Sequence, residues 1–122
     1  MIEWDKVRYF RRNEFGHHLG VEPDEALVMM LDDARLYAGR PFFITSGIRS
    51  PKVNSEVGGS PKSAHLTGHA VDIRCTSDNY RWHMVDALTA VGFRRIGVYD
   101  HHIHVDTDPT KPQDRLWLGL SS

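Results

Sequence analysis

Residues 60–74, SPKSAHLTGHAVDIR, change from a turn-forming composition to a strand pattern within one short stretch. The first part is rich in serine, proline and glycine, which favour loops. The second part, AVDIR, alternates so that Asp72 lies on the strand face opposite to its valine and isoleucine. Two histidines, His65 and His69, precede this strand. The stretch therefore predicts a half-buried strand preceded by a polar loop that carries imidazole groups.

On the N-terminal side of this stretch, residues 23–40 read as a helix. The segment PDEALVMMLDDARLYAGR begins with helix-start residues, repeats apolar residues at the spacing of one helix face, and is ended by Gly39 and Pro41. The next segment, PFFITSG, indicates a short strand that ends at Gly47. Residues 48–68 are polar and rich in turn-forming residues, so they predict a long loop, which in a compact domain is often functional.

On the C-terminal side, Ser77 is expected to cap a second helix that ends near Val91. Residues 93–107, FRRIGVYDHHIHVDT, read as two strands or one bent strand, and antiparallel pairing is expected because no long crossover separates them. The apolar residues 116–118, LWL, are expected to fold back on the core as a lid. These elements predict an α+β fold with a small, mainly antiparallel sheet packed against helices. Residues 1–122 are long enough for one domain and no second module.

The composition argues against several functional classes. The formal net charge is -1, so no surface for nucleic acid is expected. Residues 1–15 are rich in charged residues and contain no long apolar run. We therefore expect no signal peptide and no membrane contact, and we expect the protein to be synthesised in the cytoplasm. The single cysteine, Cys75, cannot form an internal disulfide and is expected to be a core residue. The chain is expected to act as a monomer.

The segment DHHIHVD, residues 100–106, concentrates groups that bind metals or transfer protons. A strand period of two places His102 and His104 on one face together with the two aspartates, and His101 on the other face. For one histidine a solvated polar face is the usual explanation. Four such groups at alternate positions favour a functional site instead.

The residue types in these two segments suit zinc. Zinc takes neutral imidazole and carboxylate ligands, and catalytic zinc sites supply three protein ligands with water in the fourth position. His65, Asp72 and His104 would form such a set. A bound zinc lowers the pKa of its water toward about 7 and polarises a carbonyl, and a neighbouring base completes a site for hydrolysis.

Several residues are candidates for the other roles in hydrolysis. His102 is the first candidate for the base because it shares a strand face with the third ligand. Asp100 and His101 are weaker candidates, since Asp100 can end a turn and His101 has the opposite strand phase. Arg49, at the start of the long loop, is a candidate to bind a substrate carboxylate or a developing oxyanion, and a surface arginine is an equal alternative. His69 is expected to lie outside the ligand set or at the surface.

Three segments match a known pattern. SAHLTGHAVD, residues 63–72, fits S-x-H-x-x-G-x-A-x-D, and HIHVD, residues 102–106, supplies an H-x-H element. ITSGIRSPKVN, residues 44–54, is similar to an S-G-x-R-S-x-x-x-N segment. Together they resemble the zinc D-alanyl-D-alanine carboxypeptidase family, whose zinc fold is shared with the hedgehog signalling domain. The resemblance covers about residues 24–107, most of the chain.

The resemblance implies a zinc metallopeptidase that cuts peptide bonds in bacterial peptidoglycan, often next to D-amino acids, with zinc-bound water as the attacking group. The implied zinc ligands are His65, Asp72 and His104. Arg49 would contact the substrate or the oxyanion. Ser63 would make a hydrogen bond either to a group behind the ligands or to the substrate, and Asn54, at a motif position, would contact the substrate. Related enzymes place an acidic base three residues before the last ligand, where this chain has His101, and others use the first histidine of H-x-H, here His102.

Two alternatives stay open at this point. A non-hydrolytic zinc-dependent binding module of hedgehog type would keep the same ligands, although the candidate base and Arg49 favour catalysis. A dipeptidase acting on free D-alanyl-D-alanine would need a small closed pocket. Because no export signal is expected, action on the cell wall requires another release route, such as that of a phage endolysin or a phage particle component. The expected activity is carboxypeptidase or endopeptidase cleavage of peptidoglycan peptides.

Overall fold

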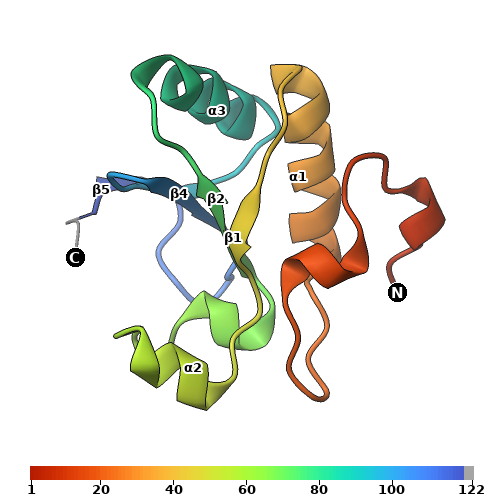
Figure 1. Ribbon diagram of the computed structural model, residues 1–122, viewed down its shortest axis with the longest axis vertical. Coiled ribbons are helices and arrows are strands. Elements are labelled where there is room, and N and C mark those ends of the chain that lie inside the picture. The colour runs from red at the N-terminus through yellow and green to blue at the C-terminus, as the bar shows by residue number, and fades with distance from the viewer. Residues whose placement is uncertain (120–122) are drawn as a thin grey trace.

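The computed structural model describes residues 1–119 (Figure 1). The helices are α1 (Glu25–Ala38), α2 (Pro51–Glu56) and α3 (Asp78–Ala90), and the short 3-10 turns are η1 (Trp4–Lys6), η2 (Arg12–Phe15) and η3 (Ala64–Thr67). The strands are β1 (Ile44–Ser46), β2 (Ala70–Arg74), β3 (Arg95–Val98), β4 (His102–Asp106) and β5 (Arg115–Leu118). None of the helices in this part of the chain has the length and apolar character needed to cross a membrane.

One sheet of five strands has the order β1-β2-β4-β3-β5. The pairs β1 with β2, β2 with β4 and β3 with β4 are antiparallel, and β3 with β5 is parallel. In the central pair, Asp72 lies opposite His104 and Val71 opposite Val105. The α+β fold with a mainly antiparallel sheet, predicted from the sequence, is confirmed.

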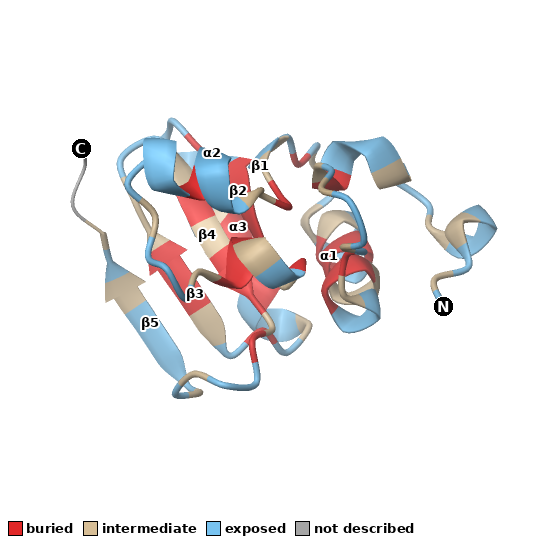
Figure 2. Cartoon of the chain, turned by 90° about the horizontal axis from the view of Figure 1, so that it is seen from below, coloured by how far each residue is buried: buried red, intermediate tan, exposed pale blue. Residues whose placement is uncertain are grey.

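The two faces of the sheet have different environments. Val71, Ile73, Ile103 and Val105 point to one face and are fully buried. Helices α1 and α3 cover this face and supply the rest of the core, mainly through Leu27, Leu31, Met84, Ala87 and Leu88. Figure 2 shows the buried residues concentrated on the central strands and α1, while β5 is mostly exposed. The other face of β2 and β4 is therefore free to carry polar side chains.

Both long helices follow the capping signals in the sequence. The Asp24 carboxylate accepts a hydrogen bond from the Leu27 amide at 3.2 Å, and Gly39 ends α1 with a φ of 65°. The Ser77 hydroxyl accepts the Tyr80 amide at 3.1 Å at the start of α3. A side-chain cap pairs one of the amides that a helix start leaves without a partner. Cys75 is 2% exposed, as expected for a core residue.

The long loop predicted for residues 48–68 is wrong in part, because α2 and η3 lie within it. Ser50 caps α2 by accepting the Val53 amide at 3.1 Å, and a proline occupies the first helical position. In α2 only Asn54 is buried. A helix so short and so exposed has no apolar face, so hydrophobic periodicity does not reveal it.

The lid predicted for residues 116–118 is also wrong. These residues belong to β5, which pairs with β3 at the edge of the sheet. Leu116 is 63% exposed and Leu118 85% exposed, so neither covers the core. Alternation along the strand puts these two leucines on the same face as their partners Ile96 and Val98, and Trp117 on the face of His104. The antiparallel pairing expected for the late strands holds for β3 and β4, whereas β5 is parallel to β3.

Candidate metal centre

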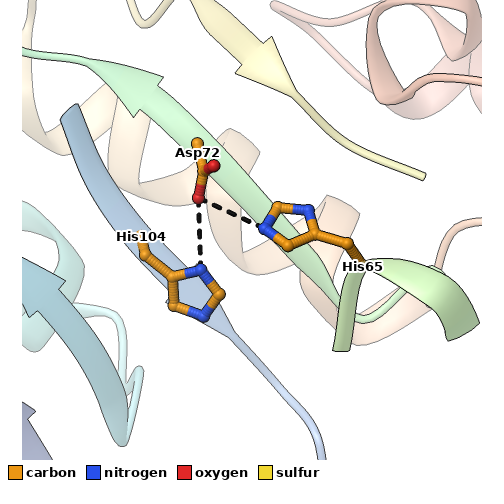
Figure 3. A group of neighbouring side chains, drawn as sticks. All are labelled: His65, Asp72 and His104. Carbon is orange, nitrogen blue, oxygen red and sulfur yellow. Dashed lines mark hydrogen bonds and ion pairs between the residues drawn. The ribbon is translucent and has the colours of Figure 1, made fainter. Parts of the chain in front are cut away.

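Three side chains from separate segments meet on the polar face of the sheet (Figure 3). Asp72 comes from β2 and His104 from the opposite position in β4, and His65 comes from η3. His65 Nε2 lies 3.3 Å, and His104 Nδ1 3.2 Å, from the same carboxylate oxygen, Asp72 Oδ1. One ligand atom from each residue lies within 4.8 Å of the other two. The structure thus brings together the three residues that the sequence suggested as a metal set.

The tight turn η3 places His65. The Ser63 hydroxyl caps this turn by accepting the backbone N–H of His65 at 3.2 Å. Gly68 ends the turn with a φ of 78°, a left-handed conformation that favours glycine. A Cβ atom at Gly68 would also overlap the carbonyl oxygen of Glu22. The imidazole of His65 is 3% exposed, so the turn delivers it to a protected position.

The hydrogen bond of the second ring nitrogen fixes the tautomer of His65. His65 Nδ1 lies 2.8 Å from the carbonyl oxygen of Gly47. A carbonyl only accepts, so Nδ1 carries the hydrogen and donates. The lone pair of Nε2 then faces Asp72, as a metal ligand requires.

His104 is fixed in the same way by a different partner. Its Nε2 lies 2.7 Å from Asp106 Oδ2, so Nε2 donates to the carboxylate and the lone pair of Nδ1 faces Asp72. Asp106 is 2% exposed, and its other oxygen accepts from Arg95 Nε at 2.8 Å. A carboxylate behind a histidine ligand orients the ring and raises its basicity.

The charges and lone pairs of the three-residue cluster favour binding of a cation. Burial alone raises the pKa of Asp72, but when the facing nitrogens of His104 and His65 carry protons, their hydrogen bonds outweigh burial and hold this pKa far below its usual value. Burial opposes protonation of His104, but the carboxylates of Asp106 and Asp72 outweigh it and raise the pKa of this imidazole. With the tautomers described above, two imidazole lone pairs and one carboxylate oxygen face each other, and only a proton or a metal ion relieves their repulsion. Two nitrogens and one oxygen are a donor set that fits zinc and leaves a coordination position open.

A cleft of about 350 Å³ gives access to this cluster. The lining residues that the sequence had suggested are Arg49, Ser63, His65, Asp72, His102 and His104. The polar and aromatic lining residues that it had not assigned a role are Ser60, Arg95, Tyr99, Asp106 and Lys111. Asp100, His101 and Asn54 do not line this cleft.

The position of His102 suits a base better than those of its neighbours. His102 Nε2 lies 3.9 Å from Asp72 Oδ2, at the edge of the three-residue cluster. Burial lowers the pKa of His102, which favours the neutral ring that can accept a proton at neutral pH. Asp100 and His101 are exposed in the turn before β4, and the His101 carbonyl accepts the Cys75 amide at 2.9 Å.

Arg49 is held rigidly beside the cluster. Its guanidinium donates to Ser46 Oγ at 3.0 Å, to Asn54 Oδ1 at 3.4 Å and to Asp72 Oδ2 at 3.2 Å. Asn54 is 3% exposed and donates to the Ser60 carbonyl at 2.8 Å. The structure therefore places Asn54 behind Arg49, where it supports the arginine and the following loop. An arginine fixed in this way presents its remaining N–H groups to the cleft without a further loss of side-chain freedom.

The sequence pattern did not predict several other features of the site. Asp106 was recognised only by its strand phase, and its bond to Arg95 depends on pairing between strands. Lys111 donates to the Lys62 carbonyl at 2.7 Å and pairs with Asp108. His69 was expected to lie outside the ligand set, and it does not line the cleft. Its Nδ1 lies 2.9 Å from Thr67 Oγ1.

Comparisons with known proteins identify one family. The family model described as Peptidase M15 matches residues 9–108, which is most of the chain. This range contains all three residues of the cluster, together with Arg49 and His102. None of the curated proteins compared with the chain matches it.

Proposed function

This chain belongs to the peptidase M15 family of zinc peptidases, and we propose that it hydrolyses peptide bonds in bacterial peptidoglycan. The observation that carries the proposal is the convergence of three ligand atoms, from His65, Asp72 and His104, beside an accessible cleft. The tautomers of both histidines are set by partners outside the cluster. Such an arrangement costs stability unless a cation occupies it, so it supports a metal-dependent activity.

A bound zinc ion would supply Lewis acidity, which polarises a carbonyl and acidifies water. The residues of the chain provide the remaining steps. His102, largely neutral at pH 7 because burial lowers its pKa, accepts the proton of the attacking water at Nε2 and passes it to the leaving amine. Arg49 donates hydrogen bonds to the substrate carboxylate or to the oxygen that gains negative charge. The Ser63 hydroxyl lines the cleft, and its proposed role is a hydrogen bond to the peptide backbone of the substrate.

The proposed substrate is a stem peptide or crosslink of peptidoglycan, cleaved as a D-alanyl-D-alanine carboxypeptidase or as an endopeptidase. The resemblance of residues 44–72 and 102–106 to the D-alanyl-D-alanine carboxypeptidases supports this choice within the family. We further propose that the protein acts as a monomer at the bacterial cell wall and is released there by a phage-type route. Nucleic acid is not among the proposed partners, because the formal net charge of -1 does not favour a polyanion.

The experiment is a digest of purified peptidoglycan by the zinc-loaded protein, with the products identified by mass spectrometry. We expect new peptide ends that disappear with a chelator and return when zinc is restored. Release of single D-alanine residues indicates a carboxypeptidase, and conversion of crosslinked dimers into monomers indicates an endopeptidase. Wall binding without new peptide ends would contradict the proposal and favour a non-hydrolytic module of hedgehog type. Cleavage of free D-alanyl-D-alanine alone would identify a dipeptidase instead.

The matched variants for this digest are His102→Ala and Asp100→Ala. His102→Ala removes the proposed base and should lower the cleavage rate by about 100-fold or more, the usual contribution of general base catalysis. Asp100 is exposed and does not line the cleft, so Asp100→Ala should cleave at nearly the wild-type rate. Equal rates for both variants would remove His102 from the mechanism.

A further inference from the structure

Two aromatic rings lie behind the proposed base. The ring of Tyr99 stacks on the imidazole of His102, with 4.5 Å between centroids and 9° between planes. Trp117, from β5, donates its indole N–H to the Tyr99 hydroxyl oxygen at 3.1 Å. The three side chains thus form a column from the edge strand to the edge of the metal centre, which we call the aromatic column.

The backbone leaves space for this column at two glycines. A Cβ atom at Gly97 would approach the Trp117 ring to 2.5 Å, closer than real Cβ contacts come. A Cβ atom at Gly119 would overlap the Tyr99 ring. The Tyr99 amide donates to the His102 carbonyl at 3.0 Å, so the two stacked residues also close a turn through their backbone. The backbone at Gly97 and Gly119 therefore packs directly against the two rings.

His102 lacks the kind of support that the metal-set histidines have. Within residues 1–119, no hydrogen bond is made to its imidazole, and its Nε2 lies 3.9 Å from Asp72 Oδ2. By contrast, Gly47 and Asp106 fix the rings of His65 and His104. The orientation of the His102 ring therefore depends on packing, and the face of Tyr99 is the surface on which it packs. Stacking of aromatic rings adds to the stabilisation that comes from burying their surface.

We propose that Tyr99 is a positioning residue, held in place by Trp117, that keeps the His102 imidazole turned toward the metal centre. The inference rests on the proposed role of His102 as the base. Tyr99 acts through His102 alone in this scheme, and Trp117 acts through Tyr99. The role also explains why β5 carries one inward aromatic side chain between two exposed leucines.

The kinetic test compares two substitutions in the zinc-loaded protein. Tyr99→Leu removes the flat surface on which the His102 ring packs. A misoriented His102 accepts the proton less efficiently, so kcat should fall about tenfold while KM and zinc content stay unchanged. Tyr99→Phe keeps the ring and loses only the hydrogen bond that the Trp117 indole donates to the Tyr99 hydroxyl. Its kcat should therefore stay within about threefold of the wild-type value. A wild-type kcat for Tyr99→Leu would overturn the proposal.

A second comparison separates positioning from a general structural effect. In a His102→Ala background, Tyr99→Leu should have no further effect on the residual rate, because the ring that it positions is gone. A damaged fold would lower the rate equally in both backgrounds, which would overturn the proposal.

A measurement without catalysis distinguishes this proposal from the proposed function. Ring protons of His102 that lie over the Tyr99 face should resonate upfield in the proton NMR spectrum, with the assignment made by their loss in His102→Gln. Tyr99→Leu should return these resonances to ordinary positions, and Tyr99→Phe should keep them upfield. Unchanged resonances in Tyr99→Leu would overturn the stacking role even if peptidoglycan is cleaved, whereas a protein without peptidase activity can still show the predicted shifts.

Discussion

Replacing Asp106 with asparagine probes the support of the metal centre without touching a ligand. The carboxylate of Asp106 is 2% exposed and accepts from His104 Nε2 at 2.7 Å and from Arg95 Nε at 2.8 Å. Asparagine has almost the same shape but no charge, and its amide presents only one acceptor. Asp106 Oδ1 also accepts the Asp108 amide at 3.1 Å, so at least one of the three donors loses its acceptor. The imidazole of His104 is then no longer held and polarised by a negative charge.

Two effects of known typical size are expected for Asp106→Asn. Loss of a carboxylate behind a histidine ligand weakens metal binding by about 10–100-fold, or about 1.4–2.8 kcal/mol. In the metal-free protein, a weakened buried hydrogen bond to a charged group costs about 2 kcal/mol of unfolding free energy. The first effect is measured by competition for zinc with a chromophoric chelator, and the second by urea denaturation.

Asp108→Asn is the matched control for this experiment. Asp108 is also buried, at 5% exposed, and lies two positions further along the chain. Its side chain bonds Lys111 and Thr110, not a residue of the metal set. This variant should lose stability but keep the zinc affinity of the wild type. A folded Asp106→Asn protein with unchanged zinc affinity, or equal weakening in both variants, would refute the proposed support of His104.

Three further perturbations test other parts of the structure. Gly97→Ala places a Cβ atom 2.5 Å from the Trp117 ring and should lower the unfolding free energy by about 1–3 kcal/mol; a thermal midpoint equal to that of the wild type would contradict this packing. Burial opposes ionisation of Asp108, but hydrogen bonds from Lys111 and Thr110 outweigh it and lower its pKa from 3.8 to about 2. The ionised Asp108 carboxylate therefore stabilises the fold above the unfolded pKa, and this stabilisation is lost as the pH falls from about 4 through 2. In urea denaturation at these pH values, the wild type should lose about 2 kcal/mol of unfolding free energy that Asp108→Asn does not lose. Zinc at 100 times its dissociation constant should stabilise the wild type by about 2.7 kcal/mol and leave the thermal midpoint of Asp72→Ala unchanged; equal shifts would place the zinc elsewhere.

The metal set could be predicted because strand periodicity is a local property. Asp72 and His104 each occupy the polar phase of a strand, and that phase is visible without knowledge of which strands pair. The register that sets them opposite each other is a long-range property. It places both residues on the polar face that the periodicity of each strand predicted. His65 was recognised by its residue type and its place before Gly68, although the 3-10 turn that holds it was not.

What the sequence did not reveal depends on tertiary partners. The hydrogen bond that Asp106 accepts from Arg95, and the stack of Tyr99 on His102, require β3 and β4 to pair. α2 was missed because its stability comes from the Ser50 cap and not from an apolar face. The segment at 116–118 was misread because its apolar content predicts burial, whereas at the edge of the sheet both leucines are exposed and only Trp117 is partly buried.

Zinc content measured on purified variants tests the central claim most directly. The account predicts one zinc ion per chain in the wild type and in His102→Ala, and none in His65→Ala, Asp72→Ala or His104→Ala after dialysis against trace zinc. Circular dichroism on the same samples establishes that each variant is folded. Zinc retained by folded His104→Ala, or lost to the same extent in His102→Ala, would contradict the assignment of His65, Asp72 and His104 as the metal ligands.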